Sequence, residues 1–361
     1  MGARLVLALG IALAALPGSA QLSAQLSAQP VKAQKPPPRL FASDQPIRFT
    51  LRGPIQAIAS AGPDSTAVRP GRLILTAPAA EEHPVNLSAR GIARRQRENC
   101  EFPPLKVEFT AKPPPTSLFE RQKKLKLVAH CRASPGFQQH VLLEYAAYKM
   151  LHVLTPTGFR VRLASVDYQN EAGKPIISRL GFFIEDPDDA GKRVGLKQVE
   201  LMGRISSAQL EPTAAARTAL FQYMVGNLDW SMRAGAAGQS CCHNAKLFAP
   251  NANARQGLIP VAYDFDFTGF VDAPYAAAPE ELGVSSVRER KYRGYCIHNP
   301  QALAVAADFR AKRGEMMAAL NAVPQLEERT KRKAMAFLDG FYRDIATDAD
   351  VQKRVLKGCI G

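Results

Sequence analysis

Two short apolar runs separated by a turn-forming stretch constrain the fold more than any other part of the sequence. The runs are Ala245–Phe248 and Leu258–Val261, and the intervening residues Pro250–Gly257 are rich in Pro, Asn and Gly. This pattern predicts an antiparallel hairpin, in which the numbers of paired residues sum to a constant. We expect Phe248 to pair with Ile259, which determines the register of the whole hairpin.

The expected register brings side chains that can bind a metal to one end of the hairpin. Asn244 precedes the first run and falls beside Asp264, while Asp229 arrives from a loop just upstream. Asp264 and Asp266 lie on one face of the extended segment YDFDFTG, two residues apart. Their oxygen atoms suit Mg²⁺ or Mn²⁺, which also bind phosphates. The cluster predicts metal-dependent phosphoryl transfer, although Asp and Asn are also common in turns for backbone reasons alone.

The amino terminus predicts an exported protein. Arg4, the apolar core Leu5–Leu16 and the small residues Gly18–Ala20 are typical of a signal peptide covering residues 1–20. No later apolar run approaches the roughly 20 residues that a membrane-spanning helix needs. Residues 21–44 are rich in Gln, Pro and Ala and predict a disordered tether. We therefore expect a periplasmic or extracellular protein without a transmembrane segment.

All six cysteines lie in the part that would be exported, and an even number in an oxidising compartment favours disulfides. We expect Cys100 to bond Cys131, and Cys241 or Cys242 to bond Cys296, although the sequence does not determine the pairing. The cluster Cys241-Cys242-His243 could also bind a metal. Adjacent cysteines suit tetrahedral zinc poorly, and no second Cys/His pair has a zinc spacing.

Residues 45–186 predict a strand-rich lobe with one long helix. The expected strands have alternating apolar residues and are separated by turns: Ile47–Leu51, Arg72–Thr76, Val85–Ala89, Leu105–Thr110, Leu125–His130, Phe159–Tyr168 and Ser178–Glu185. The helix is expected at Gln138–Leu154. Glu144 lies on its apolar stripe, where an acid is either a partner of the helix dipole or a buried partner for a cation. With Lys126 near the end of the preceding strand, we expect a Lys126–Glu144 ion pair.

Residues 187–361 predict a mixed and helical lobe that carries the metal site. The acidic stretch EDPDDAGK is expected to be a solvated loop or, as the alternative, a calcium loop, although it lacks the spacing of an EF-hand. A helix is expected from Pro212 through Val225, ended by Gly226. Further helices are expected at Pro300–Leu320 and Gln325–Ile345. The chain is thus assigned to the α+β class, with a strand-rich first half and a helical second half.

The order of these features resembles a protein kinase. Along the chain come a strand with Lys126, a helix with Glu144, a loop with Asp229, then Asn244, a hairpin and Asp264. This order is similar to that of the atypical kinases of the spore-coat CotH type. Four segments are similar to parts of that family: SARGIARRQ, PPLKVEF, KLKLV and LGFFIED. The resemblance extends over roughly Val85–Ala273. The resemblance implies a two-lobed protein-kinase-like fold, ATP or another nucleotide held by Lys126, and Lys126 oriented by Glu144. It also implies Asp229 as base, and Asn244 and Asp264 as metal ligands.

The sequence departs from the kinase pattern in three places. Asp229 and Asn244 are 244 − 229 = 15 residues apart, with the segment MRAGAAGQS between them, and DFDFTG replaces Asp-Phe-Gly. No Gly-x-Gly-x-x-Gly precedes Lys126. We therefore expect Arg90 or Arg94 to cover the phosphates.

The formal net charge of +15 restricts the partners. Nucleic-acid binding would favour basic clusters on one face with aromatic platforms, whereas the clusters here are dispersed and the sequence has one Trp. A protein or an anionic envelope polymer is the expected partner. Three functions remain: an exported phosphotransferase; a non-catalytic binding or scaffold protein, favoured by the scarcity of ATP outside the cytoplasm; and a metal-dependent hydrolase using Asp229, Asp264 and Asp266. The oligomeric state is not predicted.

Overall fold

Seven strands in the first half of the chain close into a barrel. The computed structural model describes residues 1–2, 36–236 and 238–361. The barrel strands are β1 (Ile47–Arg52), β2 (Arg69–Leu75), β3 (Glu81–Ala89), β4 (Leu105–Phe109), β5 (Lys124–Val128), β6 (Val161–Gln169) and β7 (Pro175–Ile184). Their order around the barrel is β1-β2-β3-β4-β5-β7-β6, and β1 closes it by pairing in parallel with β6.

The expected two-lobed protein-kinase-like fold is therefore wrong, although all seven expected strands form. Every neighbouring pair of barrel strands is antiparallel except β1 with β6, where Ile47 pairs with Ala164 and Arg52 with Gln169. This pairing joins segments more than a hundred residues apart. Alternation within a strand predicts which side chains are buried but not which distant strand becomes its neighbour, so the sequence pattern did not predict closure.

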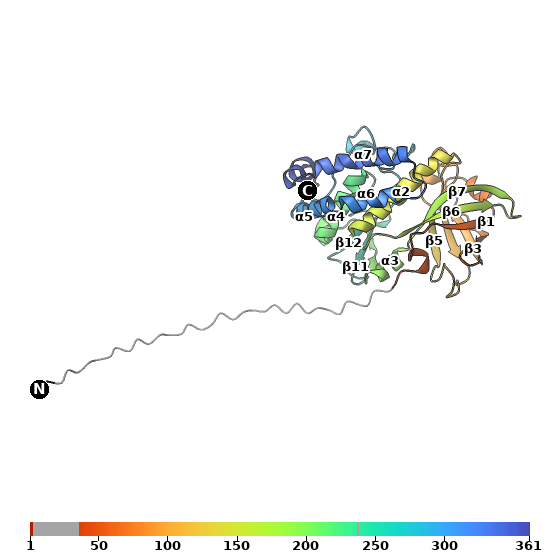
Figure 1. Ribbon diagram of the computed structural model, residues 1–361, viewed down its shortest axis with the longest axis horizontal. Coiled ribbons are helices and arrows are strands. Elements are labelled where there is room, and N and C mark those ends of the chain that lie inside the picture. Colours follow the sequence, from red (N-terminus) through yellow and green to blue (C-terminus); the bar gives the residue numbers. More distant parts are fainter. Residues whose placement is uncertain (3–35, 237) are drawn as a thin grey trace. The chain divides into compact units, whose positions relative to one another are not determined.

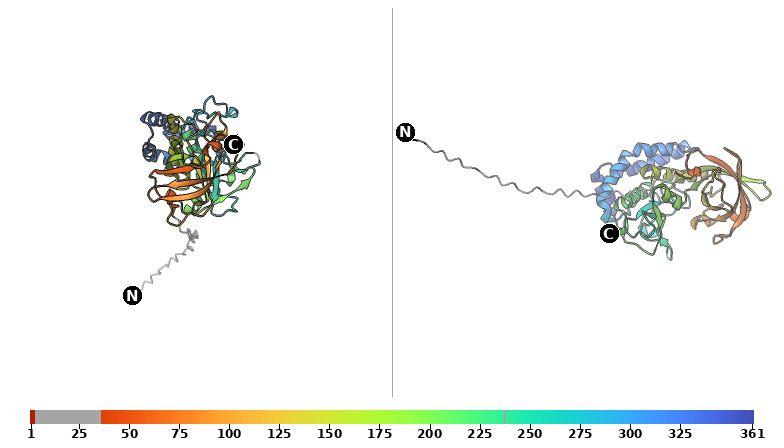
Figure 2. Two further views of the ribbon diagram at one scale, coloured as in Figure 1. Left: turned by 90° about the vertical axis from the view of Figure 1, so that its right-hand side faces the viewer. Right: turned by 90° about the horizontal axis from the view of Figure 1, so that it is seen from below.

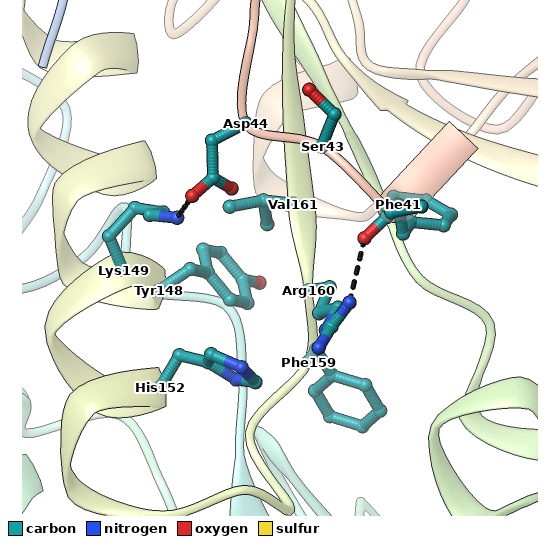
Figure 3. A pocket seen from close by; sticks show the side chains of 10 residues that line it. Phe41, Ser43, Asp44, Tyr148, Lys149, His152, Phe159, Arg160 and Val161 are labelled. Carbon is teal, nitrogen blue, oxygen red and sulfur yellow. Dashed lines mark hydrogen bonds and ion pairs between the residues drawn. The ribbon is translucent and has the colours of Figure 1, made fainter. Parts of the chain in front are cut away.

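The barrel core is aromatic and includes residues from the predicted tether. Phe49 and Phe183 stack with ring centroids 5.2 Å apart. Leu40 and Phe41, in the short helix η1 (Arg39–Phe41), are also buried in this core. Asp44 follows and forms an ion pair with Lys149, as Figure 3 shows. The folded part of the chain thus begins before residue 45, and the stretch 36–44 belongs to it.

The helices gather in the second half of the chain, apart from α1 and α2. They are α1 (Ile55–Ala59), α2 (Gln138–Leu154), α3 (Pro187–Arg193), α4 (Pro212–Val225), α5 (Asn299–Ala311), α6 (Arg313–Asn321), α7 (Glu328–Asp344) and α8 (Asp348–Asp350). In Figure 1, α2 runs between the barrel strands and the helices α4 to α7. Figure 2 (right) shows the blue helices α5 to α7 at one end of this folded part and the orange barrel strands at the other.

Two helices have the predicted bounds, and one expected loop is a helix. α2 and α4 begin and end as expected, and Gly226 ends α4 in the left-handed conformation with φ of 64°. The acidic stretch after Ile184 forms α3 instead of a loop. Asp186 caps it by accepting the N–H of Asp188, and Pro187 occupies its first turn, which is where proline suits a helix.

Two small sheets complete the fold. β8 (Lys197–Val199), β11 (Ala245–Ala249) and β12 (Ile259–Ala262) form a three-stranded sheet in the order β12-β11-β8, and β9 (Leu201–Met202) pairs with β10 (Ser240–Cys241). Leu247 of β11 pairs with Val199 of β8, so the predicted hairpin gains a third strand.

Three disulfides are present, as the cysteine count predicts, but only one has the expected partners. Cys100 bonds Cys131 as expected. Cys241 and Cys242 bond each other, and Cys296 bonds Cys359. The second expectation was wrong because the chain end returns to Cys296, whose N–H donates to the carbonyl of Ile360 over 2.9 Å.

The predicted signal peptide and most of the predicted tether lie outside the described residues. Within the described ranges, no helix is long and apolar enough to cross a membrane. The three disulfides are compatible with an oxidising compartment, where such bonds persist.

Candidate functional site

The hairpin has the predicted register. Phe248 pairs with Ile259 and Ala245 with Ala262. One step beyond the ladder, the N–H of Tyr263 donates to the carbonyl of Asn244 over 3.1 Å. Asn244 therefore lies beside Asp264, as the sequence predicts.

Asp229 reaches the same end of the hairpin from the loop after α4. The side-chain nitrogen of Asn244 donates to the Asp229 carbonyl at 2.6 Å and to its carboxylate at 3.2 Å. Ser231 and His243 pair in an antiparallel bridge, so the segment between them begins and ends at the same place in the structure. The 15-residue separation therefore does not keep Asp229 and Asn244 apart.

His243 is a contact of Asp229 that the prediction of the site did not include. Its Nε2 lies 2.7 Å from Asp229 Oδ1, and both side chains are partly exposed. The hydrogen bond to Asp229 raises the pKa of His243, against the effect of burial. His243 and Asn244 together hold both oxygens of the Asp229 carboxylate, which orients it.

Asp264 adopts a backbone conformation that is rare for residues with a side chain. Its φ is 66°, in the left-handed region that Asp and Asn tolerate better than most residues. Its N–H donates to the hydroxyl of Tyr148 on α2 over 2.9 Å. Among the described residues, no cation forms an ion pair with its half-buried carboxylate, which instead lies in hydrogen-bond contact with that of Asp266.

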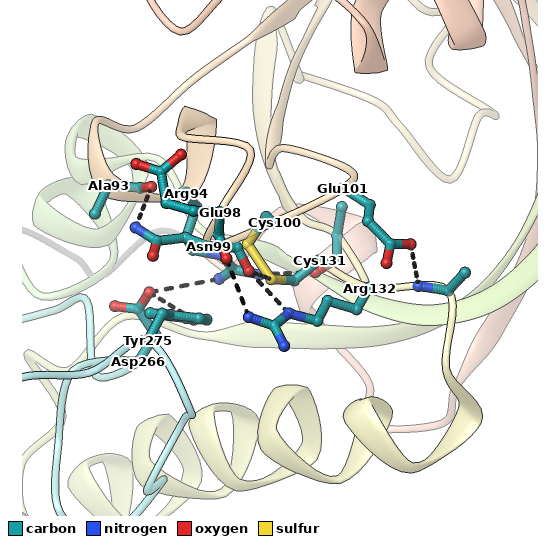
Figure 4. Close-up of a disulfide and its surroundings, with 12 residues drawn as sticks. Ala93, Arg94, Glu98, Asn99, Cys100, Glu101, Cys131, Arg132, Asp266 and Tyr275 are labelled. Carbon is teal, nitrogen blue, oxygen red and sulfur yellow. Dashed lines mark hydrogen bonds and ion pairs between the residues drawn. A yellow bond between two sulfur atoms is a disulfide. The ribbon is translucent and has the colours of Figure 1, made fainter.

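Arg94, not Lys126, is the partner of Glu144, which corrects the expected ion pair. Arg94 lies 3.2 Å from the Glu144 carboxylate and 3.9 Å from that of Asp266. Asp266 also accepts a hydrogen bond from the Tyr275 hydroxyl at 3.0 Å. Figure 4 shows Arg94 and Asp266 beside the Cys100–Cys131 disulfide. The sequence indicated Lys126 instead, because Arg94 comes from the short helix η2 (Ala93–Arg95), which precedes β4 and is distant in sequence from Glu144.

Arg94 and Asp266 therefore lie in a buried cluster that the sequence did not predict. Arg94 is buried against two carboxylates, so it is not positioned to cover phosphates. Asp266 is also buried, beside Arg94, Tyr275 and Asp264, and its role as a metal ligand stays a prediction. The carboxylate of Asp264 is the more accessible of the pair.

The buried acids outnumber the cation that they contact. Burial, and then Asp264, raise the pKa of Asp266 to about 7, against the effect of Arg94. Burial also raises the pKa of Glu144 well above its usual value, again against Arg94. Although burial opposes it, Tyr275, Glu144 and Asp266 raise the pKa of Arg94. Arg94 thus stays charged, and the excess negative charge is relieved by a proton or by another cation.

Lys126 lies over the ring of Tyr263, the residue that precedes Asp264. Its Nζ is 5.4 Å from the ring centroid, and the Nζ of Lys246 is 5.5 Å from the same centroid. Burial, then Arg90 and Lys246, lower the pKa of Lys126 to about 8, so it remains mostly protonated at neutral pH. No carboxylate in the described part of the chain pairs with it.

An open cavity adjoins Lys126. It has a volume of about 520 Å³ and is lined by three lysines, Lys124, Lys126 and Lys246, together with Asp186, Asp188 and Glu200. Arg90 is half-buried, and its charge also lowers the pKa of Lys126. The three acids match the three lysines in number, so a phosphate group would contact the lysine side of this cavity, where Arg90 adds a further cation. Lys246 could have been identified from the sequence, because it lies two residues after Asn244 on the same face of β11.

The oxygens at the hairpin end fit a hard divalent cation that retains water. Asp264 offers a carboxylate without an ion-pair partner, and the hydrogen bonds from the Asn244 nitrogen leave its amide oxygen as an acceptor. In the described ranges, no three Asp, Glu, His or Cys side chains converge closely enough to hold a metal by themselves. Mg²⁺ and Mn²⁺ use few protein ligands when phosphate and water supply the rest, so the donor set matches a cation that arrives with a phosphate.

No protein-family model matches the chain, and no curated protein is significantly similar to it in sequence. The resemblance to CotH-type kinases therefore stays a prediction.

Proposed function

We propose that this protein is an exported, metal-dependent phosphotransferase that moves a phosphoryl group from a nucleotide to a hydroxyl of a protein or an envelope polymer. One observation carries the proposal: Asp229, Asn244 and Asp264 meet at one end of a hairpin whose Tyr263 also contacts Lys126. Positioning and charge neutralisation are the main requirements of phosphoryl transfer. These four side chains supply both.

Each residue has a defined role in this reaction. Lys126, supported by Lys246, would hold the phosphates in the open cavity. Asn244 and Asp264 would hold Mg²⁺ or Mn²⁺, which would offset the charge on the phosphate oxygens. Asp229, oriented by His243, would accept the proton of the acceptor hydroxyl. The hydroxyl oxygen forms the new bond to phosphorus while the bond to the leaving nucleoside diphosphate breaks.

A second function, a non-catalytic binding protein, is favoured by a specific observation. Lys126 has no carboxylate partner in the described residues, because Glu144 pairs with Arg94. A lysine without an orienting acid can still bind phosphate but is less restricted in position. In this alternative the protein binds the cation and the nucleotide but does not transfer the phosphoryl group. Asp266, which a hydrolase mechanism would use, is buried against Arg94 and Tyr275.

The test measures transfer and binding separately. Residues 21–361 are incubated with Mn²⁺ and γ-labelled ATP, and label on the protein and free phosphate are followed, together with ATP binding by calorimetry. We expect label transfer that is lost in Asp229→Asn while ATP binding is retained, and Lys126→Met to weaken ATP binding. Lys192→Met is the matched control, because Lys192 is a surface lysine paired with Asp189. Binding without label would support the non-catalytic alternative, and no binding would contradict both.

A further inference from the structure

A second cavity lies along α2, where Tyr148, Lys149 and His152 line it. It has a volume of about 250 Å³ and is lined by Asp44, Lys149, His152 and Arg160, among others. Figure 3 shows α2 contributing Tyr148, Lys149 and His152 to one side, opposite Phe41, Asp44 and Arg160. The cavity is therefore built by three separate segments of the chain.

A larger apolar cavity adjoins the first one. It has a volume of about 530 Å³, and its walls include Val153, Val323 and Pro324 and three alanines of α6 and its end, Ala318, Ala319 and Ala322. Both cavities are lined by Asp44, Lys149 and His152, so they meet at these side chains. The combined space has a charged part and an apolar part, as the binding site of an amphipathic molecule requires.

The charged part has an excess of positive charge. Among its lining residues, Lys149 and Arg160 are cations and Asp44 is the acid. Burial, and then the charges of Arg193 and Arg160, lower the pKa of His152. Arg193 itself is neutralised by Glu185, 2.9 Å away. One additional negative charge would therefore balance the cavity.

The Asp44–Lys149 contact indicates which anion fits. The Asp44 carboxylate lies 2.6 Å from Lys149 Nζ, yet its side chain is 72% exposed, whereas that of Lys149 is 23% exposed. An ion pair with such an exposed partner contributes little and is easily replaced. A ligand carboxylate can take the place of Asp44 on Lys149 without moving the rest of the chain.

We propose that these two joined cavities bind a fatty-acid anion, with its carboxylate on Lys149 and Arg160 and its alkyl chain along the alanines of α6. The positive charge of Lys149 and Arg160 favours a carboxylate, and the apolar walls of the larger cavity favour an alkyl chain. Tyr148 lines this space and also contacts Asp264, but none of the residues assigned to phosphoryl transfer lines it, so the proposal stands or falls separately from the proposed function.

Calorimetric titration of residues 21–361 with decanoate tests this site, with decanol and decyltrimethylammonium as controls for the chain alone and for the opposite charge. We expect sub-millimolar binding of decanoate and about tenfold weaker binding of decanol, since a charged hydrogen bond is worth about one decade or more. Equal affinity for decanoate and decanol, or no binding of decanoate, would overturn the proposal.

Two substitutions make the test specific for the charged part. Lys149→Met should weaken decanoate binding by about tenfold. Asp44→Asn should strengthen it, because the competing carboxylate is removed while the exposed side chain of Asp44 contributes little to folding. Lys192→Met, which removes another lysine that is paired with an aspartate, should leave the affinity unchanged. Weaker binding by Asp44→Asn, or unchanged binding by Lys149→Met, would contradict the proposed orientation.

Discussion

At the scale of single residues, the buried cluster of Arg94, Glu144 and Asp266 determines how the candidate site responds to pH. Two acids share one guanidinium, and burial penalises each ionised carboxylate. Neither the strands nor the helix pattern indicates this cluster, because its members come from the short helix η2, from α2 and from the segment after a hairpin.

Asp266→Asn should change the pH dependence of stability. The pKa of Asp266 in the folded protein, about 7, is above its unfolded value, so the folded state binds the extra proton. The free energy of unfolding therefore falls as pH rises between the two pKa values. The variant lacks this loss, so its stability relative to the unmodified protein should increase from about pH 4 to about pH 7. Urea unfolding across this range measures the difference; a constant difference would contradict the prediction.

A double-mutant cycle should show that Arg94 and Glu144 are coupled. Arg94→Met leaves two buried acids without their cation and should cost about 3–5 kcal/mol in unfolding free energy. Combining it with Glu144→Gln should cost clearly less than the sum of the single changes. Lys126→Met with Glu144→Gln is the control cycle and should be additive within about 0.5 kcal/mol. Additivity in the Arg94 cycle would show that this ion pair does not form.

At the scale of elements, the hairpin and α2 were predictable from local sequence pattern, whereas the segments that contact them were not. Turn residues and alternation set the register of Phe248 with Ile259, and periodicity set the bounds of α2. The acidic stretch that forms α3 was taken for a loop because its Asp-Pro start is also a turn signal. The contact of His243 with Asp229 was not predictable from the sequence, because the two residues are brought together only by the bridge between Ser231 and His243.

Tyr148 links α2 to the hairpin, and Tyr148→Phe should loosen this contact. The Asp264 N–H would lose its acceptor, which should cost about 1–3 kcal/mol in unfolding free energy. The left-handed backbone of Asp264 would be less firmly held, so Mn²⁺ affinity measured by calorimetry should also fall. Tyr145→Phe, which changes another buried tyrosine of α2, is the control. Equal effects of the two changes on Mn²⁺ affinity would contradict a link through Tyr148.

At the scale of the whole molecule, the strands were predictable and the fold class was not. Each barrel strand has the alternation that buries one face, but closure depends on the parallel pairing of β1 with β6. That pairing joins distant segments, and no local pattern specifies it. The order of Lys126, Glu144, Asp229, Asn244 and Asp264 along the chain suggested a kinase-like arrangement. Order alone did not determine which of these side chains meet.

The central claim is that the hairpin end binds a divalent cation together with a nucleotide, and thermal unfolding with Mn²⁺ and ATP tests it most directly. Asp264→Asn is the informative variant, since Asn tolerates the left-handed backbone at this position. Asp272→Asn is its matched control, because Asp272 also has a positive φ, of 52°, but pairs with Arg288 on the surface.

Ligand at about a hundred times its Kd should raise the free energy of unfolding by about 2.7 kcal/mol. We predict this gain in the unmodified protein and in Asp272→Asn, and its loss in Asp264→Asn. No gain in the unmodified protein, or an equal gain in Asp264→Asn, would contradict the assignment of the site.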